Sequence, residues 1–376
     1  MIRQRIQLSI VDVGYGGAGV ARTAEGVVFV PGAFLGERVE VEIIKRKKRF
    51  AQARLLCVLE PSADRIVPET EVMPGMPEVA LKQRQLQALL LRIGHFENLP
   101  FLHSPVASPI SNHYRNKLTL HFDGQRIGYI GEDNRTVIET PQCPLSATPI
   151  NEQLSCLRTD RQVWREMRPG QRVVFRYTPQ DGVVWWVGQP PRRQLTEKLS
   201  GLTLLVAADA FFQVNPVCSE LLLKAYKQDV EAASVRRVFD LYCGCGLFGL
   251  AAVQVGAKEL LGLETSSSAV ASAQENARRL GVKANYLCAP SEALPDAFPR
   301  ADMWVVDPPR GGLSEAVRTH ILRQLPPRLI YVSCGPDTLA RDLMALSDAY
   351  QVARMQLFDF FPRTAHFETL TTLVRR

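Results

Sequence analysis

The sequence predicts an α/β protein in which a doubly wound, Rossmann-like sheet follows two smaller β-rich parts. From about residue 200, short apolar runs alternate with segments of helical pattern, as strands and their crossover helices do. Before residue 60, short alternating runs are separated by glycine turns, which is typical of a small β-barrel. We therefore expect a barrel over residues 1–60, a linker and β-rich α+β domain over 61–200, and the Rossmann-like domain over 201–376.

Length and composition limit the classes of protein that fit. A chain of 376 residues, 46% of them hydrophobic, can bury a large core in several domains. No run approaches the roughly 18 consecutive apolar residues of a membrane span, and the alternating N-terminus is unlike a secretory signal. We expect a cytoplasmic protein with no membrane partner, whose eight scattered cysteines are thiols. A formal net charge of +7 permits nucleic-acid binding without establishing it.

The N-terminal part carries a basic run. We expect strands over residues 6–10, 26–30 and 37–41, with the run Lys45–Arg49 between two strands. The glycine-rich stretch Gly14–Ala21 and Val30-Pro-Gly make this part resemble a TRAM domain, an OB-like module of RNA-modifying enzymes. The basic run is either a solvated loop or a phosphate contact on RNA, and the resemblance favours contact.

The middle of the chain begins as a proline-containing linker, continues in a predicted helix over 81–91 and then becomes β-rich. The strand-like runs cover residues 117–122, 126–129, 172–175 and 183–186. They predict an antiparallel domain inserted before the Rossmann-like part. Tyr114–Lys117 is either a guide for RNA or an ordinary charged strand end, and the sequence leaves both readings open.

A glycine-rich turn follows the apolar run at Val238. Asp240 precedes Gly244-x-Gly246, and glycines let backbone N–H groups approach a ligand closely. An acid before Gly-x-Gly is the turn of S-adenosylmethionine-binding methyltransferases, whereas phosphate-binding Rossmann turns have another order. Glu264 ends the next predicted strand, where a carboxylate can bind ribose hydroxyls. An ordinary tight turn is the alternative, but the two acids favour a nucleoside-type cofactor.

Three later segments carry side chains that could take part in catalysis. Asp307-Pro-Pro-Arg follows a buried strand and is either a strand terminator or a rigid loop over the ligand-binding edge of the sheet. Cys334 also follows a strand, so it is either a small buried hydrophobe or a nucleophile. Glu368 lies close to His366, and taken alone either residue could be an ordinary polar group.

Taken together, these segments resemble the 5-methyluridine RNA methyltransferases over nearly the whole chain. The matching motifs are Asp-Leu-Tyr-Cys-Gly-x-Gly, Asp-Pro-Pro-Arg, Tyr-Val-Ser-Cys-x-Pro-x-Thr-x-Ala-Arg-Asp, Phe-Pro-x-Thr-x-His-x-Glu and Phe-x-Gln-Val-Asn. The resemblance implies a class I methyltransferase fold, S-adenosylmethionine as cofactor and RNA as partner. With its N-terminal TRAM module the chain is similar to the family branch that acts on 23S ribosomal RNA, since the tRNA branch generally lacks this module.

The resemblance also implies roles for individual residues. Cys334 would attack C6 of uracil, and Glu368 would later remove the C5 proton. The target uridine would have to leave its stack. The cofactor would be bound by Gln213, Asp240, Tyr242, Gly244, Gly246, Glu264 and Asp307.

One departure from the family concerns an iron–sulfur cluster that many TRAM-bearing relatives carry. Methionines stand in Glu69–Pro77, where a Cys-x-x-Cys would fall, and clusters are held by cysteine thiolates. We therefore predict no cluster and no metal site, with Cys143 a plain buried thiol. Cys243 and Cys245 are expected to pack in the cofactor turn.

Three alternatives remain open. A tRNA uridine-C5 methyltransferase would share every motif. A methyltransferase for an exocyclic amine would use Asp-Pro-Pro but would not need Cys334 or Glu368. An RNA-binding or assembly factor could keep the fold without catalysis, although the intact Cys/Glu pair argues against it. The sequence leaves the modified uridine and the oligomeric state undetermined.

Overall fold

The structure is a computed structural model that describes every residue except 1–3, 49, 63–78, 100, 132 and 295–299. The chain forms two compact units: Met1–Asn98 with Phe361–Phe367, and Leu99–Phe360 with Glu368–Arg376. A short segment of the C-terminal half, Phe361–Phe367, therefore belongs to the N-terminal unit. The domain borders that the sequence predicts at residues 60 and 200 stay a prediction.

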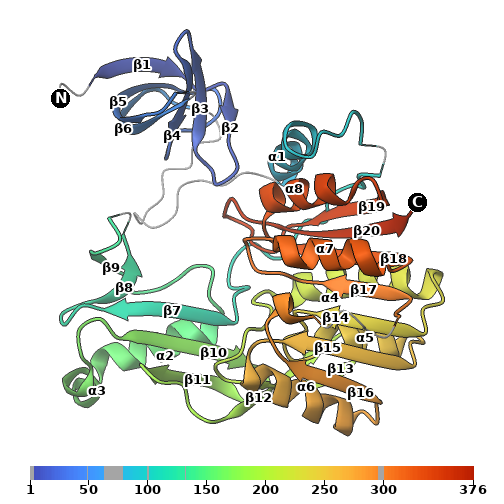
Figure 1. Cartoon of the computed structure of the whole chain (residues 1–376). Helices are drawn as coiled ribbons and strands as arrows, with labels where there is room; N and C mark the ends of the chain where they lie inside the picture. The colour runs from blue at the N-terminus through green and yellow to red at the C-terminus, as the bar shows by residue number, and fades with distance from the viewer. Residues whose placement is uncertain (1–3, 49, 63–78, 100, 132, 295–299) are drawn as a thin grey trace. The chain divides into compact units, whose positions relative to one another are not determined.

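The N-terminal unit is built on one six-stranded sheet with the order β1-β5-β6-β4-β3-β2 (Figure 1). Its strands are β1 (Arg5–Ser9), β2 (Asp12–Val13), β3 (Gly19–Thr23), β4 (Gly26–Val30), β5 (Arg38–Arg46) and β6 (Phe50–Glu60). Val30, Val39 and Val41 are fully buried in its core. The strands expected over 6–10, 26–30 and 37–41 are confirmed.

The position of the basic run differs from the expectation. Lys45 and Arg46 belong to the end of β5, so the run begins within a strand instead of between two strands. Lys45 and Arg46 pair with Gln52 and Ala51 of β6, just after a register shift between Ile43 and Lys45. The helix predicted over 81–91 is confirmed as α1 (Val79–Arg92).

The next sheet is antiparallel and five-stranded, with the order β11-β10-β7-β8-β9. Its strands are β7 (Lys117–Phe122), β8 (Ile127–Ile130), β9 (Val137–Glu139), β10 (Arg172–Thr178) and β11 (Gly182–Val187). The four predicted strands are confirmed, and β9 was not predicted. Between β9 and β10 lie two helices that the sequence analysis missed, α2 (Thr148–Thr159) and α3 (Arg161–Glu166). The α3 helix begins where the side chain of Asp160 accepts hydrogen bonds from Gln162 N and Val163 N.

A short hairpin leads into the last part of the chain. β12 (Gln194–Leu199) and β13 (Leu202–Ala207) pair with each other, and Asn276 of α6 (Ser267–Arg279) bonds to both the N–H and the carbonyl of Leu205. The hairpin is followed by α4 (Pro216–Ala232), which Asn215 caps.

The largest sheet has seven strands in the order β16-β15-β14-β17-β18-β20-β19. Its strands are β14 (Arg237–Leu241), β15 (Glu259–Glu264), β16 (Ala284–Cys288), β17 (Met303–Val306), β18 (Arg328–Ser333), β19 (Tyr350–Phe358) and β20 (Glu368–Arg375). The first five are parallel, and β20 lies antiparallel between β18 and β19. The predicted doubly wound sheet is confirmed.

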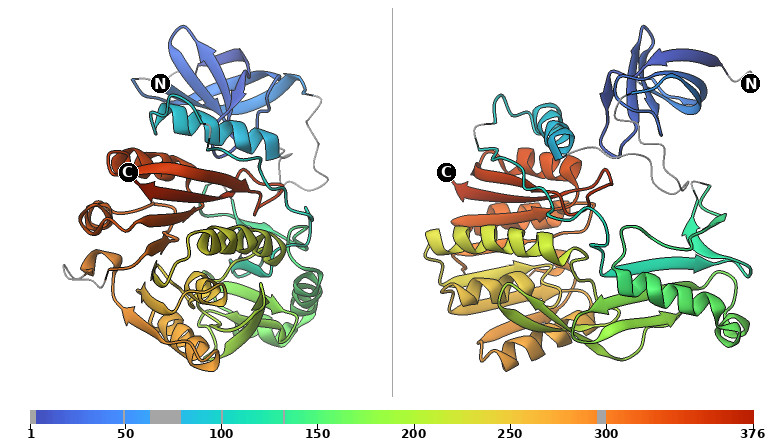
Figure 2. Two further views of the ribbon diagram at one scale, coloured as in Figure 1. Left: turned by 90° about the vertical axis from the view of Figure 1, so that its right-hand side faces the viewer. Right: turned by 180° about the vertical axis from the view of Figure 1, so that it is seen from behind.

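Helices cover both faces of this sheet, with α4 and α5 (Leu247–Gln254) on one side and α7 (Glu315–Gln324) and α8 (Pro336–Leu346) on the other (Figure 2). The motif residues follow the carboxyl ends of the parallel strands, where sheets of this type bind ligands. In the part of the chain that the structure describes, no helix combines the length and apolarity needed to span a bilayer.

Candidate active site

The glycine-rich turn joins β14 to α5 through three residues with positive φ. Tyr242 has φ 68°, Gly244 has φ 51° and Gly246 has φ 90°. The N–H groups of Tyr242 and Cys243 donate to Leu263 O of β15, at 2.9 Å and 3.0 Å. A Cβ at Gly246 would lie 2.7 Å from Tyr286 Oη, so glycine is required there for space as well as for backbone conformation.

Asp240 lies fully buried at the end of β14. Its Oδ2 accepts a hydrogen bond of 2.8 Å from Gly249 N. Its Oδ1 is buried too, and has no hydrogen-bond partner among the residues that the structure describes. Burial raises the pKa of Asp240 to about 8, and the charges of Asp307 and Glu264 act in the same direction. An unsatisfied buried acceptor is costly and is typical of a site that a ligand completes.

Glu264 ends β15 and connects the two neighbouring loops. One carboxylate oxygen accepts from Gly244 N at 3.1 Å, and the other accepts from Ser266 N at 2.8 Å. A Cβ placed on Gly244 would meet nothing within 4 Å, so this side of the turn is open. The unsatisfied oxygen of Asp240, the open turn and the Glu264 carboxylate fit a ligand that carries hydroxyl donors, as a nucleoside does.

Tyr242 belongs to the same turn, and its hydroxyl bonds to Ser291. Burial raises the pKa of this phenol above its usual value. The positive φ of a bulky residue is strained, and the two backbone bonds to Leu263 hold it in place.

Gln213 follows the hairpin and is nine-tenths buried. Asn116 fixes its backbone: Asn116 Nδ2 donates to Gln213 O at 3.2 Å, and Asn116 N donates to Val214 O at 3.0 Å. Asn215 Nδ2 in turn donates to Phe360 O at 3.0 Å. Asn116 lies in Tyr114–Lys117, so at least this member of the segment is a buried structural contact. Phe211, in contrast, is 67% exposed.

Asp307 follows β17 and keeps partial exposure. Burial nevertheless raises its pKa to about 7. The loop after it is fixed by Asp342 of α8, a fully buried residue that the sequence analysis did not single out. Asp342 Oδ2 accepts from Leu313 N and from Tyr331 Oη, both at 2.8 Å. Asp342 Oδ1 accepts from Arg318 Nη1 at 2.8 Å.

Cys334 comes directly after β18. The last pair of the β18–β20 ladder is Ser333 with Thr369, and Cys334 and Glu368 are the residues that adjoin this pair on its outer side. The thiol is half-buried. Burial raises its pKa to about 12; the charges of Glu368 and Asp307 add to this, and that of Arg310 opposes it.

Glu368 is the first residue of β20 and is buried. Its Oε2 finds no hydrogen-bond partner within the described chain. Burial raises its pKa well above the usual value; Asp307 acts in the same direction and Arg310 opposes it. Burial disfavours the ionised form of both groups, so Cys334 must lose its proton before it can act as a nucleophile, and Glu368 must be ionised before it can accept a proton.

The charges of Asp307 and Glu264 act on several of the predicted site residues. Asp307 raises the pKa of Asp240, Cys334 and Glu368, and Glu264 raises that of Asp240. Gly244 and Gly246 belong to the same turn. The contacts recorded for Gln213 involve its backbone, and its role toward a ligand stays a prediction.

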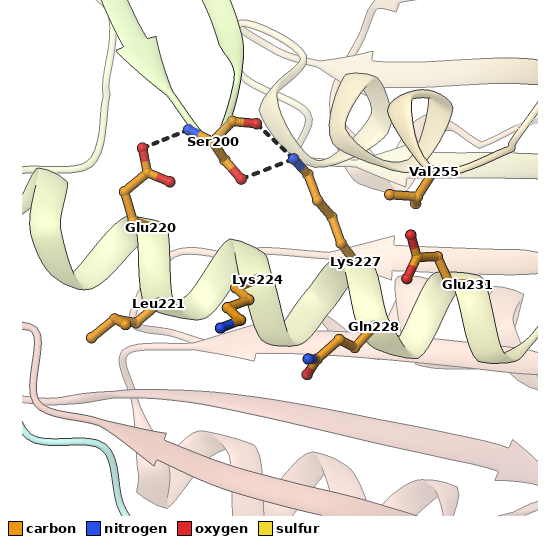
Figure 3. A pocket seen from close by; sticks show the side chains of 8 residues that line it. All are labelled: Ser200, Glu220, Leu221, Lys224, Lys227, Gln228, Glu231 and Val255. Atoms are coloured by element: carbon orange, nitrogen blue, oxygen red, sulfur yellow. Dashed lines mark hydrogen bonds between the residues drawn. The ribbon is translucent and has the colours of Figure 1, made fainter.

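Two surface hollows lie apart from these residues. One of about 380 Å³ is lined by Arg158, Arg161, Trp164 and Arg165. The other, of about 410 Å³, lies along α4 (Figure 3). There Lys227 Nζ donates to Ser200 O at 2.6 Å, and Ser200 N donates to Glu220 at 2.6 Å. These hydrogen bonds, which we call the α4 clamp, hold Lys227 and Glu220 of the helix against Ser200 in the turn of the β12–β13 hairpin.

The cysteines bear on the predicted absence of a metal centre. Cys143, Cys243 and Cys245 are buried, as expected. Cys143 Sγ lies 3.2 Å from Tyr129 Oη. Among the described residues no group of three or more histidine, cysteine or acidic side chains could hold a metal ion. The methionine-bearing stretch 69–77 lies outside the described residues, so the absence of a cluster stays a prediction.

Family models match three segments of the chain. Residues 1–56 match the TRAM domain, residues 217–305 match ribosomal protein L11 methyltransferase, and residues 295–376 match tRNA (uracil-5-)-methyltransferase. The last segment contains both Cys334 and Glu368.

Similar proteins extend over the whole chain. An uncharacterized RNA methyltransferase of Thermosynechococcus vestitus is 31% identical over 98% of this chain and 97% of its own length. A 23S rRNA (uracil(1939)-C(5))-methyltransferase of Aeromonas hydrophila is 28% identical over 99% and 97%. The crystal structure of a Pyrococcus abyssi tRNA (uracil-54, C5)-methyltransferase with S-adenosyl-L-homocysteine superposes with a TM-score of 0.77. It is 21% identical and covers 98% of this chain and 100% of its own, so it supports the fold.

Proposed function

The chain belongs to the TRAM-containing RNA (uracil-C5)-methyltransferases, and on this basis we propose that it methylates a uridine of 23S ribosomal RNA through a covalent bond to Cys334. It is an S-adenosylmethionine-dependent RNA methyltransferase. The ribosomal substrate is supported by the Aeromonas relative, which is similar over almost the full length. The tRNA enzyme of Pyrococcus is more distant in sequence. A cytoplasmic location stays a prediction.

The observation that carries the mechanism is that Cys334 and Glu368 adjoin the last pair of the β18–β20 ladder, with the charge of Glu368 acting on the Cys334 thiol. C5 of uracil is a weak nucleophile, so it must be activated before it can take a methyl group. The thiol of Cys334 loses its proton to solvent and the thiolate attacks C6, so that a C6–S bond forms and the electron pair of the C5–C6 double bond becomes an enolate with density at C5. S-adenosylmethionine supplies the methyl group, whose carbon is electrophilic because it is attached to a sulfonium sulfur.

Release of the product needs a base. The carboxylate of Glu368 takes the C5 proton, the electron pair of that C–H bond restores the C5–C6 double bond, and the C6–S bond breaks. Cys334 leaves as a thiolate and Glu368 holds the proton. We propose that Glu368 and Cys334, which adjoin the last pair of the β18–β20 ladder, reach adjacent carbons of one ring.

The cofactor side uses the groups around the glycine-rich turn. We propose that Gln213, Tyr242, Gly244 and Gly246 line the site, with Glu264 and the unsatisfied oxygen of Asp240 as polar contacts. Asp307 stands between these groups and the Cys334–Glu368 pair, since it influences the pKa of Asp240 on one side and of both catalytic candidates on the other. We place it at the junction of cofactor and target base.

Two other functions need separate consideration. Methylation of an exocyclic amine would need neither the Cys334 thiol nor the Glu368 carboxyl. An RNA-binding factor without catalysis would have no need for a buried carboxyl whose Oε2 has no hydrogen-bond partner within the described chain. Burying such a group costs stability, and the uridine-C5 reaction gives it a use.

Nucleoside mass spectrometry tests the proposed substrate. Unmodified 23S ribosomal RNA and unmodified tRNA are each incubated with the protein and S-adenosylmethionine. We expect new 5-methyluridine in the ribosomal sample. The same nucleoside in tRNA alone would reject the ribosomal assignment, and a base methylated on an amine would reject the covalent mechanism.

A further inference from the structure

Lys82 of α1 is fully buried and holds the chain segment that leads into Glu368. Its Nζ donates to Phe361 O at 3.1 Å and to His366 O at 2.9 Å. These carbonyls lie near the two ends of Phe361–Phe367, the segment that belongs to the N-terminal unit. A lysine is almost never fully buried unless its amino group is bound, so packing alone does not explain this choice of residue.

The segment has a strained conformation that needs support. Arg363, at its centre, has φ 62°, which is uncommon for a residue other than glycine. Thr364 N and Thr364 Oγ1 both donate to Phe361 O, at 3.1 Å and 2.8 Å, and Thr364 Oγ1 accepts from His366 N at 3.2 Å. Lys82 stabilises this compact turn by donating to a carbonyl near each of its ends.

The barrel contacts the same segment and the same helix. The ring of Tyr15 lies edge to face with those of His366 and Phe367, with centroids 6.3 Å and 6.0 Å apart. Gln85, one helical turn from Lys82, donates from Nε2 to Val13 O and Gly14 O, both at 3.2 Å. The loop around Tyr15, helix α1 and the segment 361–367 therefore form one connected group within the N-terminal unit.

We propose that Lys82 is a positioning residue that couples the barrel to the placement of Glu368. Phe367 is joined directly to Glu368, the first residue of β20, so the segment and the carboxyl-bearing residue are neighbours in the chain. A barrel engaged with RNA would thereby stabilise the segment through Tyr15 and Lys82. This proposal rests on the proposed function, in which Glu368 takes the C5 proton.

The proposal predicts which step fails when Lys82 no longer holds the segment. A displaced Glu368 leaves the attack of Cys334 intact but slows removal of the C5 proton, so the RNA stays bound to the thiol. A helix that merely contributes stability would instead lower the amount of active enzyme without trapping this species. The amount of covalent RNA–protein complex formed on ordinary uridine RNA separates the two cases.

The test uses Lys82→Met, which keeps the length and apolar stem of the side chain but removes its donor. We expect kcat to fall about 10- to 100-fold, as a small misplacement of a catalytic group does, with KM for S-adenosylmethionine unchanged and the covalent complex accumulating. Lys82→Arg, which retains donors, is expected to recover part of kcat. A kcat within twofold of wild type, or a fall in kcat without accumulation, would overturn the proposal.

Two further variants keep the test decisive. Lys227→Met is the matched control, because Lys227 also donates to a backbone carbonyl but in the α4 clamp (Figure 3); it is expected to trap no covalent complex. If Lys82→Met does not fold, Tyr15→Leu decides, since it removes the barrel's aromatic contact and must also trap the complex. A wild-type protein that makes no 5-methyluridine would reject the proposed function itself, whereas an active wild type with untrapped variants rejects the coupling alone.

Discussion

Cys334 and Glu368 adjoin Ser333 and Thr369, the last pair of the β18–β20 ladder, and the charge of Glu368 raises the pKa of the Cys334 thiol. The two residues come from separate motifs, and the antiparallel return of β20 beside β18 brings them together. Burial raises the pKa of the Cys334 thiol, and the charge of Glu368 raises it further. This pair is the basis of the chemistry that we propose.

Replacing Cys334 by alanine should abolish methyl transfer, because no other residue is proposed to activate C5. S-adenosylmethionine binding should change little, since the groups proposed to hold it lie around the glycine-rich turn. Methyl incorporation and calorimetric cofactor binding measure the two effects. Full turnover by Cys334→Ala would instead favour the methylation of an amine.

Replacing Glu368 by glutamine should allow the attack of Cys334 but stall release of the RNA. Loss of a general base typically lowers the rate about 10²–10⁴-fold, and the amide keeps the shape of the buried side chain. Denaturing gel electrophoresis would reveal a persistent RNA–protein complex on ordinary uridine RNA. Normal turnover in this variant would remove Glu368 from the mechanism.

The buried carboxyl of Asp240 should make stability depend on pH. Its pKa rises from 3.8 to about 8 on folding, so the folded state binds the proton more tightly than the unfolded state. The free energy of unfolding contributed by this group is therefore fully present below about pH 4 and is lost as the pH rises through about 8.

Asp240→Asn tests this linkage in the cofactor-free protein. The amide can still accept from Gly249 N, but it has no proton to lose. Between pH 5 and pH 8 the fall in unfolding free energy should become shallower by about 1 kcal/mol per pH unit. Urea titrations at several pH values measure both slopes. Equal slopes for wild type and variant would show that Asp240 is not the titrating group.

Much of this architecture follows from local sequence. Apolar runs ending in Gly244, Asp307 and Cys334 predict strands that reach one edge of a sheet, and these strands are present. The position of the basic run was less predictable, because exposed strand ends and loops have similar composition. Lys45 and Arg46 extend β5 only because β6 offers backbone partners.

The basic run should contribute to RNA affinity through charge. Lys45, Arg46, Lys47 and Lys48 are exposed, and Arg46 is also paired with Glu25. Changing the three lysines to glutamine should weaken RNA binding and reduce the slope of log affinity against log salt by about 0.7–0.9 for each phosphate that the protein no longer neutralises. Filter binding over a salt series measures the slope.

Lys224→Gln on α4 is the control for total charge, because its side chain lines the hollow along that helix (Figure 3). It should leave the slope nearly unchanged. If the variant without the three lysines has the same salt slope as the wild type, the basic run makes no phosphate contact and is only solvated.

Asp342 should be important for stability, although it contacts no reacting atom in the proposed mechanism. It is buried, bonds to Arg318 and also accepts from Leu313 N and Tyr331 Oη. Asp342→Ala should lower the free energy of unfolding by about 3–5 kcal/mol, the usual cost of breaking a buried charged pair. Chemical denaturation measures this, with the exposed Asp337→Ala on the same helix as control. A loss under about 1 kcal/mol would mean that the network is dispensable.

Asp342 and Lys82 also mark what the sequence could not reveal. Asp342 stands within a recognisable motif, but its role depends on a loop 29 residues away along the chain. Lys82 lies in a helix of ordinary composition, and its acceptor Phe361 is 279 residues distant. Contacts of this range depend on the tertiary fold, and no local pattern encodes them.

The most direct test of the proposed mechanism is to map the covalent bond. RNA that carries 5-fluorouridine at the target position is incubated with the wild-type protein and S-adenosylmethionine, and the cross-linked peptide is identified by mass spectrometry. Fluorine at C5 cannot be removed as a proton, so the complex should persist with the RNA attached to Cys334. Absence of a complex, or attachment to another residue, would contradict the proposed mechanism.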